Sequence, residues 1–259
     1  MRRSQLIEFH DSEWFPLSLR DAVTSTLQHV LNSTRYYELA APILASGMRA
    51  TESDRVIDLC SGGGGPWQKL IRLIGESEPV SVLLTDKFPN LACFDSNQSH
   101  GDNGVDYFPQ SVDAEAIPSS FCGFRTFFNC FHHFPPDRAR RILCSAAAQG
   151  EGIAIFEVPE RSWRGICSTI LMPLGAIALL PSACPFRLST LFWTYMIPVI
   201  PFVMWFDGLV SCLRAYAPDE LRAMAPAVSA YTWKSGTLRD RFSPVSVTYL
   251  IGYAEKPPS

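Results

Sequence analysis

Four consecutive glycines follow a short apolar segment, and aspartates stand where their carboxylates could meet a ligand bound there. The segment reads V-I-D-L-C-S-G-G-G-G-P-W from Val56 to Trp67. Glycine has no Cβ, so its backbone can approach a ligand closely, and the helix that follows presents free N–H groups. The segment therefore predicts a binding site for a nucleotide-like cofactor.

The acidic residues and the glycine spacing favour one class of cofactor over another. Asp58 precedes the glycines, and Asp86 ends the next apolar segment, where its carboxylate could accept hydrogen bonds from both hydroxyls of a ribose. Dinucleotide-binding loops read G-x-G-x-x-G, and Pro66 and Trp67 stand where the third glycine would follow. This pattern favours an adenosyl group without a pyrophosphate.

Apolar segments of strand length alternate with helical patterns along the middle of the chain. This alternation predicts an α/β fold, a Rossmann-like, mostly parallel sheet with helices on both faces. The predicted strands are Arg55–Cys60, Val80–Thr85, Val105–Val112, Phe124–Phe131, Ile153–Val158, Tyr231–Lys234 and Val245–Tyr253. The predicted helices among them are Pro66–Ile74, Pro135–Gln149 and Pro218–Met224.

The order of these patterns divides the chain into four parts. We expect a helical layer over residues 1–50, which acts as a lid or packs on the core, and a cofactor-binding core over 51–160. An apolar helical insert occupies 161–210, and residues 211–259 complete the core with a helix and strands.

In these motifs the chain resembles the class I S-adenosylmethionine-dependent methyltransferases. Their first motif is approximately acidic-x-G-x-G-x-G, and here Asp58 to Gly64 reads D-L-C-S-G-G-G, with Cys60 at the first glycine position. The T-D-K-F-P-N segment around Asp86 and the D-A-E-A-I-P segment from Asp113 match the later acidic motifs. The resemblance covers about residues 55–160 and implies a seven-stranded sheet whose last strand is antiparallel.

The resemblance implies S-adenosylmethionine as the cofactor and a set of residues that would bind it. These are Asp58, Cys60, Ser61, Gly62, Gly64, Asp86, Lys87, Asp113, Ala114 and Asn129. Asp58 could instead serve the loop by accepting its N–H groups, and Gly63 and Gly65 could serve turn geometry only.

Two histidines follow the fourth predicted strand, in F-F-N-C-F-H-H-F. His133 and His132 are candidate catalytic residues, because an imidazole can accept a proton near neutral pH. Neighbouring residues on a strand point to opposite faces, so we expect at most one of them to face the substrate. We expect no metal site, because no second cluster of ligands accompanies this pair and Cys130.

Candidate acceptor contacts are His133, Glu157, Asp207 and Arg214. Glu157 ends the fifth predicted strand, where parallel sheets usually bind ligands. Asp207 and Arg214, with Ser211 and Tyr216, could line the acceptor site or could be ordinary caps and helix surface.

The insert contains two long uncharged stretches, between Arg164 and Arg187 and between Arg187 and Asp207. Each is near the length that spans a bilayer, but five prolines interrupt them. Three interpretations stay open: a buried apolar hairpin that forms an acceptor chamber or an oligomer interface, a helical pair lying on a membrane, or a two-pass span. If residues 165–206 contact a partner, we expect it to be a membrane surface or a second copy of this chain.

Composition argues against several other classes of protein. The net charge of -3 gives no support for binding nucleic acid. Eight cysteines form no C-x-x-C pair, which argues against a zinc ribbon and a disulfide scaffold. The basic N-terminus is followed by Glu8 and Asp11 instead of an apolar run, so we expect no secretory signal and a cytoplasmic location, with or without membrane association.

These observations predict methyl transfer from S-adenosylmethionine to a small, hydrophobic acceptor, with the methylated atom undetermined. Two alternatives stay open: a Rossmann oxidoreductase that uses NAD(P), and a non-catalytic, membrane-associated partner protein that retains the fold.

Overall fold

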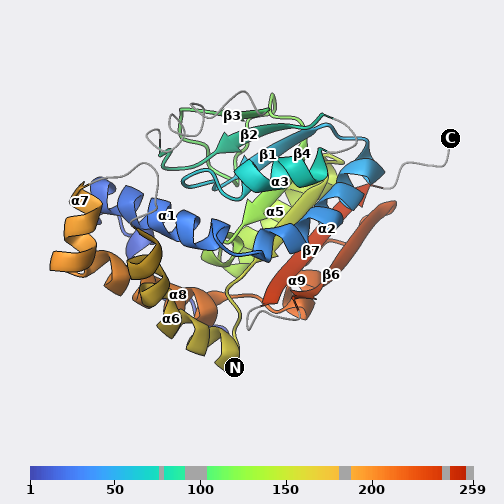
Figure 1. Ribbon diagram of the computed structural model, residues 1–259. Helices are drawn as coiled ribbons and strands as arrows, with labels where there is room; N and C mark the ends of the chain where they lie inside the picture. The colour runs from blue at the N-terminus through green and yellow to red at the C-terminus, as the bar shows by residue number, and fades with distance from the viewer. Residues whose placement is uncertain (76–78, 91–103, 181–187, 241–245, 255–259) are drawn as a thin grey trace.

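The computed structural model describes residues 1–75, 79–90, 104–180, 188–240 and 246–254. Its centre is a seven-stranded sheet in the order β3-β2-β1-β4-β5-β7-β6 (Figure 1). The strands are β1 (Arg55–Leu59), β2 (Ser81–Thr85), β3 (Val105–Tyr107), β4 (Phe124–Phe128), β5 (Ile153–Glu157), β6 (Tyr231–Arg239) and β7 (Ser246–Ala254).

The first five strands are parallel, and β7 runs antiparallel to both of its neighbours, β5 and β6. The predicted fold class and the antiparallel last strand that the resemblance implied are therefore confirmed. The register pairs Asp58 of β1 with Leu84 of β2 and with Thr126 of β4, so the carboxyl ends of the central strands lie at one edge.

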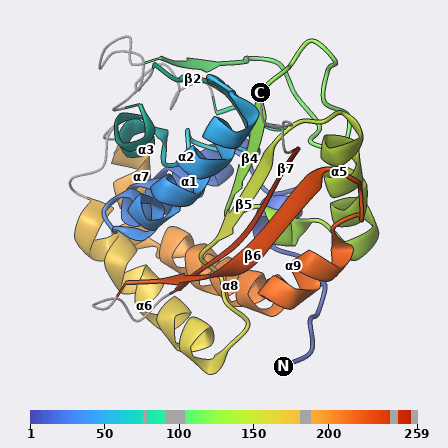
Figure 2. The ribbon, with the colours of Figure 1, turned by 90° about the vertical axis from the view of Figure 1, so that its right-hand side faces the viewer.

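Helices cover both faces of the sheet (Figure 2). One face carries α1 (Leu17–Asn32), α2 (Tyr36–Thr51) and α3 (Trp67–Ile74), and the other carries α5 (Pro136–Ala148) and α9 (Pro218–Met224). Side chains of β5 alternate between two apolar clusters, Ala154 and Phe156 in the first and Ile153 and Ile155 in the second. A strand buried on both faces needs this continuous apolar sequence.

The insert forms a third helical group beside α1 (Figure 1). It contains α6 (Trp163–Leu179), α7 (Leu188–Leu191), the π-helical turn η4 (Phe192–Met196) and α8 (Val199–Arg214). A separate apolar cluster joins Val23 of α1 to Ala176 of α6 and Val203 of α8. Residues 181–187 of the predicted insert, with Arg187, lie outside the described residues, as does Val245 at the start of the last predicted strand.

Three predicted strand boundaries are wrong. The third strand ends at Tyr107 rather than Val112. The fourth ends at Phe128, because Asn129 adopts a positive φ of 54° that breaks the extended backbone. The sixth runs nine residues to Arg239, since pairing with β7 keeps its polar second half extended.

Candidate functional site

The glycine loop joins β1 to α3 in a backbone conformation that side chains disfavour. Gly62, Gly64 and Gly65 have φ values of +57°, +113° and +57°. Glycine adopts this region readily, whereas other residues are strained there by about 1–2 kcal/mol. Cys60 also has a positive φ of 60°, so the position where the related motif carries glycine is left-handed here too.

Helix α1 holds this loop from one side. The side-chain amides of Gln28 and Asn32 both donate to the carbonyl oxygen of Gly65, each at 3.2 Å. A Cβ at Gly62 would lie 2.9 Å from Cγ2 of Thr24. The loop backbone therefore lies close under α1, and a side chain at Gly62 would separate them.

Asp58 and Ser61 are buried and connect the loop to the strands on either side. Thr126 Oγ1 donates to Asp58 Oδ1 at 2.6 Å, and the backbone N–H of Thr85 donates to Ser61 Oγ at 3.2 Å. Burial raises the pKa of Asp58 to about 7, because hydrogen bonds from Thr126 and Ser61 offset only part of the desolvation. The Asp58 carboxylate therefore contacts the neighbouring strand β4, and its role toward the loop N–H groups or a cofactor stays a prediction.

Asp86 follows β2 and contacts the glycine loop directly. Its Oδ2 accepts the N–H of Gly62 at 2.7 Å, and its Oδ1 accepts the N–H of Phe88 at 2.7 Å. Burial raises its pKa, against the lowering effect of these backbone donors. Each carboxylate oxygen has a second lone pair, so Asp86 can still accept hydrogen bonds from hydroxyl groups.

Asp113 lies near Asp86, beyond β3. Lys87 Nζ lies 3.8 Å from Asp113 Oδ2, and the backbone N–H of Val112 donates to the carbonyl of Asp86 at 2.9 Å. Asp113 and Lys87 are solvent-accessible, whereas Ala114 is buried. The carboxylates, a lysine and the side-chain-free loop at this edge fit an adenosyl group, whose hydroxyls and amine are hydrogen-bond donors.

Asn129, predicted to contact the cofactor, has its amide engaged within the protein. Its Nδ2 donates to the hydroxyl of Tyr37 at 2.5 Å, and its Oδ1 accepts the N–H of Val158 at 2.7 Å. These contacts connect the ends of β4 and β5 to α2. A cofactor contact by Asn129 stays a prediction.

The two histidines do not lie on a strand, so the expectation that they point to opposite faces is wrong. They belong to the 3-10 helix η2 (Phe131–His133), and their rings lie side by side with centroids 4.4 Å apart. His132 Nδ1 lies 2.5 Å from Glu157 Oε2, and the N–H of Phe131 donates to Glu157 Oε1 at 2.6 Å. Glu157 is buried and positions η2.

Both ring Nε2 atoms face Glu8, from the N-terminal segment. His132 Nε2 lies 3.7 Å from Glu8 Oε1, and His133 Nε2 lies 3.6 Å from Glu8 Oε2. His133 Nδ1 pairs with Asp11 Oδ1 at 2.9 Å. Burial alone would lower the pKa of His133, but the charge of Glu8 and the contact with Asp11 raise it to about 9.

Arg214, at the end of α8, completes this cluster and is buried. It lies 2.5 Å from Asp11 Oδ2 and 3.3 Å from Glu8 Oε1, and its NH2 donates to the carbonyl of His133 at 2.9 Å. Desolvation would raise the pKa of Asp11, but its contacts with His133 and Arg214 lower it strongly. Arg214 is therefore neither a cap nor helix surface.

Asp207 connects the cluster to the glycine loop through the N-terminal segment. Its carboxylate accepts the N–H groups of Phe9 and His10, at 2.8 and 3.3 Å, and contacts His10 Nδ1 at 3.1 Å. The other ring nitrogen of His10 lies 2.9 Å from Oγ1 of Thr24, the residue beside Gly62. Polar contacts thus run from α8 through His10 to Thr24 on α1, whose methyl group lies beside Gly62 of the loop.

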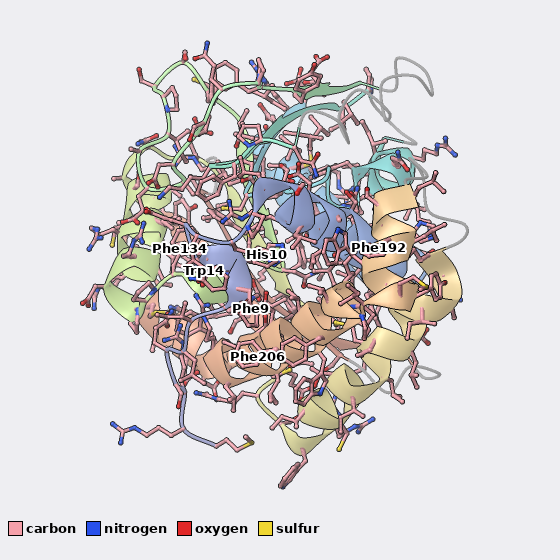
Figure 3. All side chains as sticks on the ribbon, turned by 90° about the vertical axis from the view of Figure 1, so that its left-hand side faces the viewer. Phe9, His10, Trp14, Phe134, Phe192 and Phe206 are labelled. Carbon is pink, nitrogen blue, oxygen red and sulfur yellow. The ribbon has the colours of Figure 1, made fainter. Side chains whose placement is uncertain are left out.

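Aromatic side chains surround this connection (Figure 3). Phe9 lies 5.0 Å from Phe206 and 5.9 Å from Trp14, measured between ring centroids. In Figure 3, Phe9 lies between His10, above it, and Phe206 of α8, below it. The N-terminal segment therefore brings both polar and apolar groups to the carboxyl edge of the sheet.

The sequence prediction missed Glu8, His10 and Asp11. They belong to the 3-10 helix η1 (Phe9–Asp11) and the residue before it, more than 120 positions from η2. The signal was the segment E-F-H-D from Glu8 to Asp11, whose charged residues entered the prediction only as evidence against a secretory signal. Glu8 also supplies the ligand cluster whose absence argued against a metal site, because its carboxylate and the two histidines bring ligand atoms within 4.8 Å of one another.

The insert keeps large apolar side chains on its outer face. Those exposed to solvent include Trp163, Ile170, Leu171 and Leu174 of α6 and Phe202 of α8. Within the described ranges, no single helix has the length and apolar composition to cross a membrane. Residues 188–196 and α8 reach that length and composition only when taken together, and they are bent by 75° where they meet.

No protein-family model and no curated protein matches the chain. Among solved structures, the (4+2) cyclase SpnF is similar with a TM-score of 0.50 and 11% identity, over 99% of both chains. A provisionally assigned zinc-dependent alcohol dehydrogenase from Rhodobacter sphaeroides has a TM-score of 0.46 and 13% identity, over 83% of this chain and 89% of that one. An O-methyltransferase family protein from Burkholderia thailandensis has a TM-score of 0.45 and 16% identity. The match covers 88% of this chain and 59% of that one. Several further neighbours are structures with bound S-adenosylmethionine or S-adenosylhomocysteine.

Proposed function

We propose that this chain, which has the fold of the class I S-adenosylmethionine-dependent methyltransferases, transfers a methyl group from that cofactor to a small, apolar acceptor. The observation that carries the proposal is the contact between Asp86 and the N–H of Gly62 at 2.7 Å. It brings the acid after β2 against the glycine loop after β1, at the carboxyl edge of the sheet, where α/β folds bind ligands.

The cofactor would lie across this edge. Asp86 would accept the ribose hydroxyls, Asp113 and Ala114 would contact the adenine, and the backbone of Gly62 and Gly64 would lie under the methionine part. A charge-assisted hydrogen bond to a carboxylate is worth about 1.5–3 kcal/mol, so Asp86 would contribute most among these contacts. The bound cofactor supplies an electrophilic methyl group on a sulfonium.

The acceptor would lie between this edge, the N-terminal segment and α8. Phe9 and Phe206 give that region apolar surface, and the cluster around Glu8 gives it polar groups. His132 is the better placed candidate base of the two histidines. Its Nε2 has no hydrogen-bond partner among the described residues, whereas Glu8 and Asp11 raise the pKa of His133 to about 9, so that His133 holds its proton near neutral pH. Alignment of acceptor and methyl group would supply most of the remaining rate enhancement.

The fold alone does not determine the reaction, since a (4+2) cyclase shares it. The test must therefore follow the methyl group. Small molecules extracted from the purified chain are identified by mass spectrometry and offered back with methyl-labelled S-adenosylmethionine. The proposal predicts that label enters one of them and that S-adenosylhomocysteine appears in equal amount. Binding of labelled cofactor without transfer to any extracted or related apolar compound would argue for a non-catalytic partner protein instead.

A further inference from the structure

The side chains of Glu8, His132 and His133 converge, although Glu8 lies in the N-terminal segment and the histidines lie in η2, in the middle of the chain. Their ligand atoms all lie within 4.8 Å of one another. The two oxygens of Glu8 divide between the histidines, with Oε1 3.7 Å from His132 Nε2 and Oε2 3.6 Å from His133 Nε2. These three residues are called the Glu8 cluster below.

The second observation is an unpartnered, buried nitrogen aimed at the centre of the Glu8 cluster. His132 is 2% exposed, and its Nε2 has no hydrogen-bond partner among the residues described. A buried polar atom without a partner costs about 1–3 kcal/mol, so it needs a ligand to offset that cost. The separation of 3.7 Å from Glu8 Oε1 is too long for a hydrogen bond.

Carboxylates hold the opposite nitrogen of each ring. Glu157 lies 2.5 Å from His132 Nδ1, and Asp11 lies 2.9 Å from His133 Nδ1. Histidines that bind a metal almost always donate their other N–H to a carboxylate or a carbonyl, which fixes the ring and leaves the free nitrogen as the ligand. Both histidines have this arrangement, and both free nitrogens point to the same carboxylate.

The charges around the Glu8 cluster favour a cation. Three carboxylates, those of Glu8, Asp11 and Glu157, contact the histidine rings, and one guanidinium, that of Arg214, faces them. Arg214 lies closer to Asp11, at 2.5 Å, than to Glu8, at 3.3 Å. The guanidinium of Arg3 also lies nearby and donates to the carbonyl of His132 at 3.2 Å. With both imidazoles neutral, as metal ligands must be, three carboxylates and two guanidiniums leave one uncompensated negative charge, which favours a cation.

We propose that Glu8, His132 and His133 bind a divalent transition-metal cation through one carboxylate oxygen and two imidazole nitrogens. This donor set suits zinc and its neighbours, whereas magnesium and calcium prefer oxygen ligands throughout. A cation about 2.1 Å from each ligand would draw them to separations of about 3.0–3.5 Å. The two Glu8–histidine separations, each to a different oxygen, are near that range, and the three ligand atoms lie within 4.8 Å of one another, so the side chains would draw closer around the ion.

Such a cation would lie on the acceptor side of the proposed methyl-transfer site and would activate an acceptor hydroxyl there. A hydroxyl or water bound to a divalent cation ionises far more readily than a free one. The cation would occupy Nε2 of His132 and so would replace that histidine as the activating group. The proposal goes beyond the proposed function, and its test requires no S-adenosylmethionine.

The test uses the full chain without an affinity tag, stripped with a chelator and dialysed. Zn²⁺ binding is measured by competition with a chromophoric chelator and by elemental analysis, with Mg²⁺ as the comparison ion. We expect about one Zn²⁺ per chain and at least tenfold weaker binding in Glu8→Gln and His133→Asn. His29→Gln, which changes a histidine on α1 outside the Glu8 cluster, should bind Zn²⁺ as the unchanged chain does.

Two further measurements distinguish loss of the metal site from loss of the fold, and imidazole ligands from thiolates. Circular dichroism and S-adenosylhomocysteine binding identify any variant that fails to fold, and Glu8→Gln changes shape least. Co²⁺ in place of Zn²⁺ should give d–d absorption without a thiolate charge-transfer band. The proposal is overturned by absence of stoichiometric Zn²⁺ binding, by unchanged binding in folded Glu8→Gln, by equal affinity for Mg²⁺, or by a thiolate band that assigns the ion to cysteines. None of these results would bear on whether the glycine loop binds S-adenosylhomocysteine.

Discussion

His132 Nδ1 lies 2.5 Å from Glu157 Oε2, and both side chains are buried. The contact joins η2, which follows β4, to the end of β5, and it directs the other ring nitrogen toward the N-terminal segment. A carboxylate on Nδ1 favours the tautomer with the proton there, so Nε2 stays free as an acceptor or ligand. The position of one buried glutamate therefore determines which ring nitrogen of His132 is left available.

Replacing Glu157 with glutamine should destabilise the fold. The carboxylate accepts two hydrogen bonds, from the N–H of Phe131 and from His132, and an amide has one oxygen to accept them. We expect the free energy of unfolding to fall by about 1–3 kcal/mol in urea titrations. Glu13→Gln, at an exposed position, is the matched control. Equal stability of Glu157→Gln and the control would show that the contact contributes nothing.

Asp58→Asn should change how stability depends on pH. Burial raises the pKa of Asp58 to about 7 from 3.8, so between about pH 4 and pH 7 the folded chain keeps a proton that the unfolded chain has released. Stability from this group is therefore present in full below pH 4 and is lost as pH rises toward 7. Asparagine does not titrate, so the variant should gain about 1–4 kcal/mol relative to the unchanged chain between pH 4 and pH 8.

The measurement is urea unfolding of both proteins at several pH values, with the difference between them plotted. Taking the difference removes the contribution of every other titrating group. A difference that stays constant from pH 4 to pH 8 would mean that Asp58 has an ordinary pKa in the folded chain.

Cys60 offers a direct test of the loop conformation. Its φ of 60° lies in the region that glycine tolerates best. Cys60→Gly should therefore be more stable than Cys60→Ala, by about 1 kcal/mol, because alanine keeps the left-handed strain. Thermal and urea unfolding of the pair measure the difference. Greater stability of the alanine variant would contradict the left-handed backbone at this position.

Asp207→Asn should release the N-terminal segment. The carboxylate accepts the N–H groups of Phe9 and His10 with separate oxygens, and asparagine can replace only one of these acceptors. Local opening should become easier by about 1–3 kcal/mol, which corresponds to about 5- to 150-fold faster cleavage. Limited chymotrypsin digestion with mass spectrometry follows the cuts after Phe9 and Trp14. Asp219→Asn, exposed on α9, should be cleaved like the unchanged chain.

The approach of Asp86 to the glycine loop could be predicted, because both follow neighbouring strands in the sequence pattern. Asp58 and the glycines occupy one strand–loop–helix unit, and Asp86 stands at the end of the next strand, so parallel pairing alone brings them together. The left-handed backbone at Gly62 explains why glycine is found there.

The cluster of charged side chains around the two histidines could not be predicted, because long-range contacts determine it. His133 meets Asp11 across 122 positions, and Arg214 meets Asp11 across 203. A local pattern extended the fourth strand to Phe131 and so separated the two histidines. The positive φ at Asn129 ends that strand and brings the two histidine rings together. The side-chain amide of Asn129 contacts Tyr37 and Val158 in this conformation.

Isothermal titration with S-adenosylhomocysteine tests the central claim most directly. We predict one binding site per chain, at least tenfold weaker binding in Asp86→Asn, since one charge-assisted acceptor is lost, and unchanged binding in Asp106→Asn, an exposed aspartate on β3. NADPH in the same titration should give no binding. Absence of binding to S-adenosylhomocysteine, or binding of NADPH in its place, would contradict the account.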